Sequence, residues 1–319
     1  MLISVLIIVA GFVLLIKGAD WLVTGASALA KKHNVSDLVI GLTIVSFGTS
    51  APELVVNTVA SINQHSDIVY GNILGSNVVN LFLILGLSAI IYPITVHSST
   101  VWKEIPISIL AVVVLYVLSN GFIMTGANVL SRIDGVILLA FFAGFLYYIF
   151  LQMKTDRLDL DEENLKKMTN LKIWVLIIIG LAGLVLGGKL VVDNAIKIAT
   201  FLGVSEKIIG LTIVAIGTSL PELMTSVVAA LKKNSDIAIG NVIGSNIFNI
   251  FLILSVSSLI NPVQFNPSFN AEHYLLAGGT LVLFIAMFTG GSKKLDRWEG
   301  VVLLGIYLLY TGWLIAGEI

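Results

Sequence analysis

The sequence predicts an all-α polytopic membrane protein with ten transmembrane helices arranged as two inverted five-helix repeats. One basis is composition: of 319 residues, 57% are hydrophobic and only 12% are charged, which is too apolar for a surface that faces water. The other is a long segment of the first half that recurs in the second half at an offset of 169 residues. Apolar runs of about twenty residues also exclude a β-barrel, whose strands alternate over about ten.

The composition excludes several other classes of protein. The chain has no cysteine, so neither a disulfide framework nor a thiolate metal site is possible. Its net charge of −1 offers no basic face to nucleic acid. We therefore expect the lipid bilayer as a partner and no nucleic acid, while the oligomeric state stays open.

Ten apolar stretches are each long enough to cross a hydrocarbon core about 30 Å thick. They cover residues 2–30, 37–62, 67–93, 104–122, 128–151, 172–200, 206–231, 236–261, 273–290 and 299–317. The first stretch has no basic residue before Lys17 and no small-residue cleavage pattern. We therefore expect a retained span rather than a signal peptide.

The basic residues between the spans fall on one side of the membrane, as expected if they stay in the cytoplasm. That side receives Lys31, Lys32, Lys103, Lys154, Arg157, Lys166, Lys167, Lys172, Lys232, Lys233, Lys293, Lys294 and Arg297. The other side receives only Arg132 and Lys207. The predicted units are a first repeat at 1–151, a cytoplasmic linker at 152–171 and a second, inverted repeat at 172–319, with both termini outside.

The repeat itself is clearest where residues 41–88 align with residues 210–257. The alignment has no gap, and 27 of the 48 positions are identical. Each half holds five spans, and because five is odd the second half enters the membrane from the opposite side. Inverted repeats are typical of secondary transporters, whose substrate site lies near mid-bilayer where the halves meet.

Two carboxylates are the strongest candidates for such a site. Glu53 and Glu222 lie deep inside the second and seventh apolar spans and are repeat mates. An intramembrane carboxylate costs on the order of 3 kcal/mol or more unless it is compensated, which indicates function; the alternative is two protonated glutamates in structural hydrogen bonds. Asp20 and Asp193 are not repeat mates, and we expect them to pair with lysines nearby in sequence: Lys17, Lys189 or Lys197.

Each glutamate ends a Gly-Thr-Ser-x-Pro-Glu motif. A proline inside a helix cannot donate to the carbonyl four residues back, so we expect freed carbonyls near the motif's glycine. Such backbone is tolerated at this depth where something satisfies it, and a cation would do so. The motif residues are Gly48, Thr49, Ser50 and Pro52 in the first half and Gly217, Thr218, Ser219 and Pro221 in the second. A simple helix kink is the alternative interpretation.

A second repeated segment, in the third and eighth spans, supplies further oxygens. Ser76 and Asn80 are four residues apart and share one helical face, as do Ser245 and Asn249. The glycines of these segments, Gly71, Gly75, Gly240 and Gly244, fit close helix packing alone. A primary amide in lipid, however, needs a polar partner.

Together these groups form a set of hard oxygen donors with two negative charges. We expect all four histidines, His33, His65, His97 and His273, to lie in loops, so that no imidazole joins the set. Oxygen donors suit Ca²⁺, whereas zinc or copper prefers nitrogen or sulfur. Several Na⁺ ions could neutralise the same two glutamates. The donor set therefore suits Ca²⁺ or several Na⁺ ions, and no cofactor is predicted.

The GTSxPE motif and the GSNxxN segment, which covers residues 75–80 and 244–249, each occur twice. Both resemble the α-repeats of the Ca²⁺/cation antiporter superfamily, in its sodium/calcium exchanger branch. The similarity covers essentially the whole chain. It implies Na⁺-driven Ca²⁺ movement by alternating access, with the first and sixth spans sliding against the other eight. It also implies that Glu53 and Glu222 bind both ions and that Asn80 and Asn249 face the centre. The Na⁺ sites implied on either side are lined by Thr49, Ser50, Ser76, Thr218, Ser219 and Ser245, with carbonyls near Ser46 and Ala215.

One departure from the superfamily bears on the ions. Some of its members carry aspartate where this chain has Asn249, so we expect neither a third carboxylate nor K⁺ co-transport. Exchange is then K⁺-independent, and electrogenic at the ratio of three Na⁺ to one Ca²⁺ that the resemblance implies. The linker lacks the large regulatory domain of animal exchangers, which indicates the plasma membrane of a prokaryote.

Three alternatives stay open at this point. A Ca²⁺/H⁺ exchanger could use the same glutamate pair, although GTSxPE favours Na⁺. A Ca²⁺ channel could also use paired glutamates, but channels usually build their pore on an oligomeric axis. An intramembrane enzyme would need a nucleophile and base or a Gly-x-Gly-Asp motif, and the chain has no such motif. We therefore predict a transporter and not an enzyme.

Overall fold

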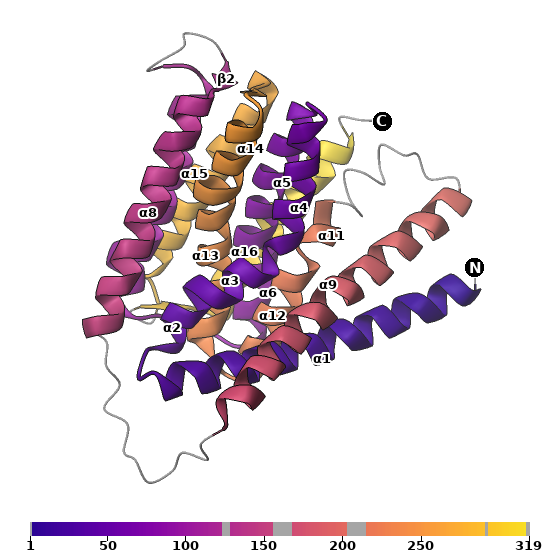
Figure 1. Cartoon of the computed structure of the whole chain (residues 1–319), viewed down its shortest axis with the longest axis vertical. Helices are drawn as coiled ribbons and strands as arrows, with labels where there is room; N and C mark the ends of the chain where they lie inside the picture. Colours follow the sequence, from indigo (N-terminus) through magenta and orange to yellow (C-terminus); the bar gives the residue numbers. More distant parts are fainter. Residues whose placement is uncertain (1, 123–127, 156–167, 203–214, 291–292, 317–319) are drawn as a thin grey trace.

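The computed structural model describes residues 2–122, 128–155, 168–202, 215–290 and 293–316. Within these residues the chain is helical apart from four two-residue strands and the connecting loops (Figure 1). Seven helical segments are long and apolar enough to cross a membrane, and a bent pair of shorter helices makes an eighth. The expectation of an all-helical polytopic membrane fold is therefore confirmed.

The first half of the chain contains long helices interrupted by π-helical turns. Its elements are α1 (Leu2–Lys32), α2 (Asp37–Ile40), η1 (Gly41–Val45), α3 (Ser46–Thr49), α4 (Ala51–Ile62), α5 (Ser66–Val78), η2 (Val79–Ile84), α6 (Leu85–Ile91), β1 (Ile94–Thr95), η3 (Thr100–Glu104), α7 (Ile105–Ser119), β2 (Val129–Leu130) and α8 (Arg132–Thr155).

The second half repeats this order. Its elements are α9 (Asn170–Phe201), α11 (Ala215–Thr218), α12 (Leu220–Leu231), α13 (Ser235–Phe248), η6 (Asn249–Ile253), α14 (Leu254–Ile260), β3 (Val263–Gln264), η7 (Pro267–Phe269), α15 (Asn270–Ala286), β4 (Lys294–Leu295) and α16 (Arg297–Ala316). Residues 206–214, predicted to begin the seventh span, lie outside the described residues.

The second span is broken where the sequence places its proline. α3 ends before Ser50, and α4 continues at an angle of 46°. Pro52 occupies the second position of α4, where a backbone N–H needs no helical partner, while its ring prevents α3 from continuing. Pro221 occupies the same position in α12, after Ser219. Each proline therefore begins a new helix whose first turn carries the glutamate.

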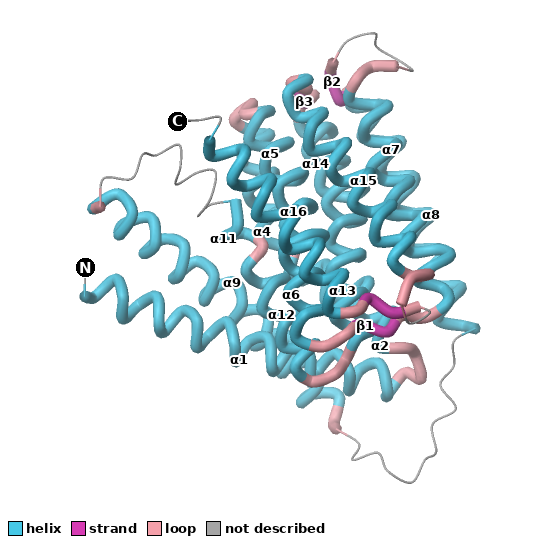
Figure 2. The backbone as a smooth tube through the Cα atoms, turned by 180° about the vertical axis from the view of Figure 1, so that it is seen from behind, coloured by secondary structure: helices cyan, strands magenta, loops and turns pink. Residues whose placement is uncertain are grey.

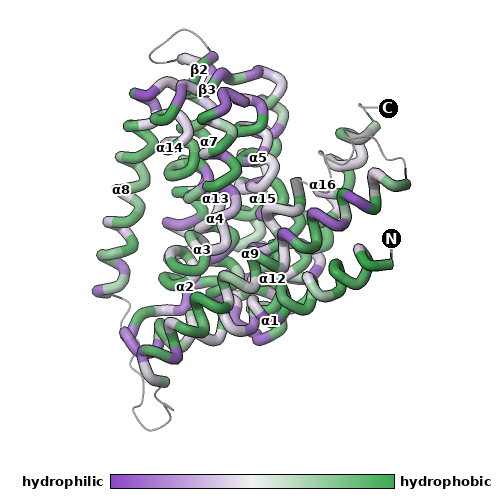
Figure 3. Tube along the Cα trace, turned by 45° about the vertical axis from the view of Figure 1, so that its right-hand side comes forward, coloured by the Kyte–Doolittle hydropathy of each residue, from purple (hydrophilic) through white to green (hydrophobic). Residues whose placement is uncertain are grey.

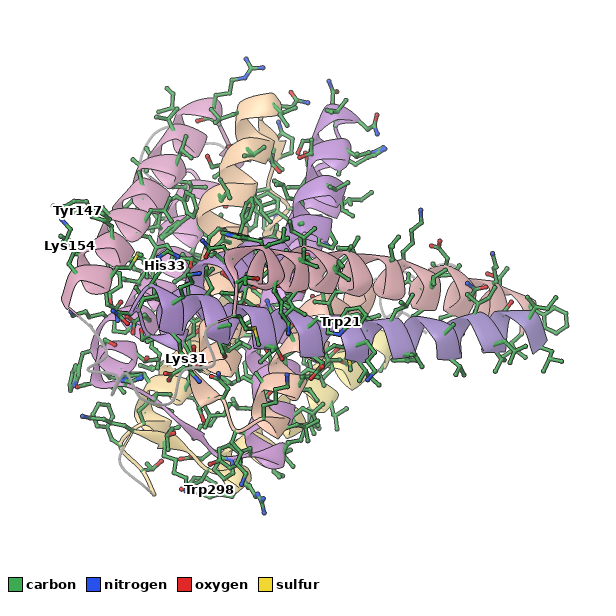
Figure 4. The ribbon with its side chains drawn as sticks, turned by 60° about the horizontal axis from the view of Figure 1, so that its bottom comes forward. Trp21, Lys31, His33, Tyr147, Lys154 and Trp298 are labelled. Carbon is green, nitrogen blue, oxygen red and sulfur yellow. The ribbon has the colours of Figure 1, made fainter. Side chains whose placement is uncertain are left out.

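α1 and α9 form a pair that runs obliquely across one end of the other helices (Figures 1 and 4). Glycines allow their backbones to approach closely. A β-carbon at Gly18 would lie 2.8 Å from the carbonyl oxygen of Gly180, and one at Gly187 would lie 2.8 Å from the carbonyl oxygen of Gly11. Small residues that let two helices touch in this way are typical of membrane proteins.

Two short antiparallel ladders join the halves at opposite ends of the bundle (Figure 2). β1 pairs with β4, with Ile94 opposite Leu295. β2 pairs with β3, with Leu130 opposite Val263. Ile94 and Val263 are separated by the repeat offset of 169 residues. Each half thus gives one strand to each ladder, in matching register.

The outward surfaces of the long helices are apolar. Figure 3 shows hydrophobic residues along α1 and α8, and Phe141, Tyr147 and Phe150 of α8 are exposed. α13, by contrast, is buried along most of its length at the centre of the bundle. Apolar side chains directed outward around a buried central helix are expected when the solvent is lipid.

Two expectations from the sequence were wrong. His273 does not lie in a loop: it sits in the first turn of α15, is buried, and has its Nδ1 3.0 Å from the carbonyl oxygen of Phe269. α15 begins earlier than the apolar run does, which places this histidine inside the helix. Asp20 pairs with Lys232, at 2.7 Å, and not with a lysine nearby in sequence, because the packing of α1 against α12 brings this distant lysine to it.

Candidate functional site

Glu53 and Glu222 occupy matching positions at the start of two helices. Glu53 lies in the first turn of α4 and Glu222 in the first turn of α12. Both side chains are buried, each with 1% of its surface exposed. The positive end of the helix dipole favours a carboxylate in the first turn. The helix break in each half therefore fixes its glutamate in an orientation that partly stabilises its charge.

The carboxylates accept hydrogen bonds from serines of the opposite half. The hydroxyl of Ser50 donates to Oε1 of Glu222 over 2.9 Å, and the hydroxyl of Ser219 donates to Oε1 of Glu53 over 3.4 Å. Each serine is the last residue before the helix that carries its own half's glutamate. The two GTSxPE motifs therefore face each other across the interface between the halves.

The GSNxxN segments add a second serine to each carboxylate. Ser76 of α5 donates to Oε1 of Glu53 over 3.4 Å, and Ser245 of α13 donates to Oε1 of Glu222 over 3.5 Å. Both serines are buried. All four predicted serines thus lie around the two carboxylates, and all of them donate to the Oε1 atoms.

The motif threonines contact amides as well as the carboxylate of the opposite half, Thr49 that of Glu222 and Thr218 that of Glu53. Thr49 donates to Oδ1 of Asn241 over 3.0 Å, and Nδ2 of Asn72 donates to the hydroxyl of Thr218 over 3.2 Å. Thr49 also lies 3.3 Å from the carbonyl oxygen of Ser46. Ala215, the other residue whose carbonyl was singled out, is the first residue of α11. The threonines therefore connect each helix break to a repeated Gly-Asn (GN) pair of the other half, Gly240-Asn241 for Thr49 and Gly71-Asn72 for Thr218.

Four asparagines form a reciprocal network between the third span and its repeat mate. Nδ2 of Asn80 donates to Oδ1 of Asn246 over 3.1 Å, and Nδ2 of Asn249 donates to Oδ1 of Asn77 over 2.9 Å. π-helical turns begin at Val79 and at Asn249, and such turns often mark functional sites. The amide nitrogens are thus satisfied, which leaves the Oδ1 atoms of Asn80 and Asn249.

Among the buried oxygens of this region that have no hydrogen-bond partner, four belong to residues that the repeat relates: Oε2 of Glu53, Oε2 of Glu222, Oδ1 of Asn80 and Oδ1 of Asn249. They form two repeat-related pairs. A buried polar atom without a partner costs about 1–3 kcal/mol, and more when it is charged. Among the described residues neither carboxylate pairs with a basic side chain. The site therefore offers two carboxylates and further acceptor oxygens, and no basic side chain of the described residues pairs with the carboxylates.

α9 contacts both helix breaks, and glycine makes room for it. A β-carbon at Gly48 would lie 2.5 Å from Leu181, and one at Gly217 would lie 2.4 Å from Val192. Both of these side chains belong to α9. The motif glycines therefore let one oblique helix pack directly against the two segments that lead into the glutamates.

Sequence reasoning missed the groups that hold the glutamate backbone. Nδ2 of Asn57 donates to the carbonyl oxygen of Glu53 over 2.8 Å and to Oδ1 of Asn72 over 2.6 Å. In the second half, Nδ2 of Asn241 donates to the carbonyl oxygen of Glu222 and to the hydroxyl of Ser226. The repeated GN pair signals the amides of Asn72 and Asn241. Asn57 and Ser226 occupy matching positions but differ in type, so the repeat gives no such signal for them.

The comparisons with known proteins agree on one family. The family model described as sodium/calcium exchanger protein matches residues 3–151 and 172–316. The chain is 35% identical to sodium/calcium exchanger MaX1 of Methanosarcina acetivorans, over 97% of each chain. It is 39% identical to an uncharacterized membrane protein of Methanocaldococcus jannaschii, over 94% of each chain.

A solved structure has the same fold over the same extent. The sodium-calcium exchanger NCX_Mj, from a crystal soaked with zero Na⁺ and Ca²⁺, superposes with a TM-score of 0.83 at 37% identity, covering 98% of this chain and 99% of that one. The resemblance carried by the GTSxPE and GSNxxN segments is thereby confirmed. This chain belongs to the sodium/calcium exchanger protein family.

Proposed function

We propose that this protein is a secondary active antiporter that exchanges Na⁺ for Ca²⁺ across a membrane by alternating access. The observation that carries the proposal is the set of four buried, unpartnered oxygens on Glu53, Glu222, Asn80 and Asn249. Two of them are carboxylate oxygens, and the halves of the chain contribute equally. A cation between the halves would satisfy all four, and membership of a transporter family makes that cation a cargo.

The chemistry of the donors favours Ca²⁺ over other divalent ions. Every candidate ligand is oxygen, and Ca²⁺ accepts six to eight oxygens in flexible geometry. Two carboxylates neutralise the charge of one Ca²⁺. When several Na⁺ ions take its place, the carboxylates neutralise two of them. In the part of the chain that the structure describes, no group of three histidine, cysteine or acidic side chains could hold a metal ion, which disfavours a transition-metal site.

We assign the oxygens as follows. Glu53 and Glu222 would bind both ions, and Asn80 and Asn249 would point their Oδ1 atoms at the central one. Flanking Na⁺ sites would use hydroxyls that already surround the carboxylates, together with the carbonyls of Ser46 and Ala215. These hydroxyls belong to Thr49, Ser50, Ser76, Thr218, Ser219 and Ser245. A hydroxyl that donates to a carboxylate keeps its lone pairs for a cation, which supports this assignment.

We infer that the architecture consists of two inverted five-span repeats, at 1–151 and 172–319, joined by a linker at 152–171. The two crossed ladders support the relation, because β1 pairs with β4 as β3 pairs with β2. So do the reciprocal bonds of Ser50 with Glu222 and Ser219 with Glu53. By the positive-inside rule the linker would be cytoplasmic and both termini outside, in the plasma membrane of a prokaryote.

The test is Ca²⁺ uptake into proteoliposomes under imposed Na⁺, K⁺ or H⁺ gradients. Uptake should require Na⁺ on the side opposite Ca²⁺, should proceed without K⁺, and should respond to membrane potential. Uptake driven by a proton gradient in the absence of Na⁺ would instead favour the Ca²⁺/H⁺ exchanger, which could use the same glutamates. Ca²⁺ flux that needs no ion on the opposite side would indicate a channel.

A further inference from the structure

Two faces that the repeat relates are covered unequally. Val59 of α4 and Val228 of α12 occupy matching positions, yet Val59 is 52% exposed and Val228 only 7%. α1 packs along α12, whereas Val55 and Val59 of α4 remain exposed. Because the halves are alike in sequence, exchanging their roles would give a second arrangement of the same fold, in which α4 is covered and α12 is uncovered.

A lysine at the end of α12 binds α1 on the face that α1 covers. Lys232 directly follows α12, and its Nζ contacts α1 through three oxygens. It lies 2.7 Å from Oδ1 of Asp20, 3.0 Å from the carbonyl oxygen of Asp20 and 2.7 Å from the hydroxyl of Thr24. The same hydroxyl donates to the Asp20 carbonyl over 2.7 Å. One ammonium group thus holds a full turn of α1 against the end of α12.

A second contact lies two residues further along the chain. Nδ2 of Asn234 donates to the hydroxyl of Ser27 over 2.9 Å and to Oδ2 of Asp37 over 2.6 Å. Ser27 is one turn beyond Thr24 on α1, and Asp37 begins α2. The short turn between α12 and α13 therefore binds successive turns of α1 through its polar side chains.

The other half has no equivalent of the charged contact. The repeat mate of Lys232 is Asn63, and the mates of Asp20 and Thr24 are Lys189 and Asp193 on α9. If α9 covered α4 as α1 covers α12, a neutral amide would replace the ammonium group. The lysine contact can therefore form in only one of the two arrangements, and it stabilises that arrangement alone.

We propose that Lys232 is a positioning residue that fastens α1 to α12 and biases the exchange between the two arrangements toward the one in which α12 is covered. It acts on the equilibrium and does not touch the transported ion. The inference rests on the proposed function only in taking the two arrangements as steps of transport. Its test measures the arrangements directly and does not depend on which ions are moved.

The experiment measures two repeat-matched distances by electron paramagnetic resonance in lipid nanodiscs. The absence of native cysteine allows spin labels at chosen pairs. One pair joins Ile16 of α1 to Leu231 of α12, and the matched pair joins Val185 of α9 to Ile62 of α4. All four side chains are exposed, and each pair is related to the other by the offset of 169 residues.

In Lys232→Ala we expect the minor population in both distance distributions to grow relative to the unmodified protein. This population has a longer distance for the first pair and a shorter distance for the second. Its share should rise about two- to fivefold, the range typical of one partly exposed ion pair. Lys232→Arg, which keeps the charge and the donors, should restore the original distributions. Asp20→Asn removes the same pair from the α1 side and should reproduce Lys232→Ala, even if one of the two variants folds poorly.

Lys233→Asn is the matched control. It removes an exposed positive charge one residue away, and asparagine tolerates the left-handed backbone of Lys233, whose φ is 58°. Both distributions should stay unchanged in this variant. Three results would overturn the proposal: no shift in Lys232→Ala, a shift in the first pair alone, or an equal shift in the control. A joint shift in a protein that moves no Na⁺ or Ca²⁺ would leave Lys232 assigned and remove the proposed function.

Discussion

The hydroxyl of Ser50 lies 2.9 Å from Oε1 of Glu222, although the two residues are 172 positions apart in sequence. The repeat mate of this contact, Ser219 with Glu53, spans 3.4 Å. Each half of the chain therefore completes the surroundings of the other half's carboxylate. Neither half contains a whole site, so the cation that we propose would bind at the interface between the halves and would sense their relative positions.

Replacement of either glutamate by glutamine should abolish Ca²⁺ transport. Glu53→Gln or Glu222→Gln leaves one negative charge for a divalent ion in a buried site. The lost attraction between one carboxylate and a divalent ion is about 8 kcal/mol at 4 Å and an effective dielectric of 20, so Ca²⁺ affinity should fall by at least about three orders of magnitude. The measurement is radioactive Ca²⁺ uptake and equilibrium binding at equal expression.

Asp67→Asn is the matched control for this pair, because it makes the same change at an exposed acid in the first turn of α5. Its uptake should match that of the unmodified protein. Near-normal Ca²⁺ uptake by either glutamine variant would remove the glutamates from the site.

Removal of a serine hydroxyl should lower ion affinity more where its hydrogen bond to the carboxylate is shorter. Hydrogen bonds to charged groups contribute about 1.5–3 kcal/mol, so Ser50→Ala should lower apparent ion affinity roughly tenfold or more. The longer contact of Ser219 predicts a smaller loss. Ser61→Ala is the control: Ser61 is also buried, it lies in the last turn of α4, the helix that follows Ser50, and its hydroxyl has no hydrogen-bond partner. Equal effects of Ser50→Ala and Ser61→Ala on Na⁺-dependent uptake would contradict this prediction.

Much of the site could be predicted from the sequence because the repeat displays it twice. Glu53 and Glu222 stand out as acids in apolar spans, and the prolines before them mark the helix breaks that the structure contains. The four serines were expected to line the site, and they surround the carboxylates. A position repeated in both halves with unusual chemistry for its depth is a signal that one chain can provide alone.

The contacts that were missed lack that signal. Asn57 supports the backbone of Glu53, but its mate is Ser226, so the repeat hides the pair. The partner of Asp20 is Lys232, which no spacing in the sequence suggests. This contact depends on how α1 lies across α12, and that packing is a property of the assembled halves. His273 was misplaced because α15 extends beyond the apolar run that was used to delimit it.

Exchange should carry charge and should not need K⁺. Glu53 and Glu222 together give −2, and Asn249 adds none, so one Ca²⁺ leaves the pair neutral and three Na⁺ leave +1. Uptake should therefore increase when the membrane potential favours the movement of that extra charge. It should be equal in K⁺ and in an inert organic cation, because no third carboxylate remains to compensate the desolvation of K⁺. A requirement for K⁺ on the Ca²⁺ side, or indifference to potential, would contradict this account.

The proposed topology can be tested with single cysteines, since the chain contains none. A cysteine in the linker at 152–171 should be protected from an impermeant thiol reagent on intact cells, and one at position 2 should react. Permeabilised cells are the control, in which both positions should react. Labelling of the linker but not of position 2 on intact cells would invert the orientation inferred from the basic residues.

The close contact of α1 with α9 should make Gly18 intolerant of any side chain. A β-carbon there would lie 2.8 Å from both the carbonyl oxygen of Gly180 and the backbone nitrogen of Leu184. Backbone atoms cannot move aside as a flexible side chain does, so the helices would have to separate. Overpacking of this kind costs about 1–3 kcal/mol. Gly18→Ala should therefore lower the melting temperature in detergent and slow exchange. Gly144→Ala in α8 is the control, because nothing lies within 4 Å of the added carbon. Its stability should be equal or slightly higher, since alanine favours helix. If Gly18→Ala melted with Gly144→Ala and transported normally, the two helices would not move as the closely packed pair that their glycines indicate.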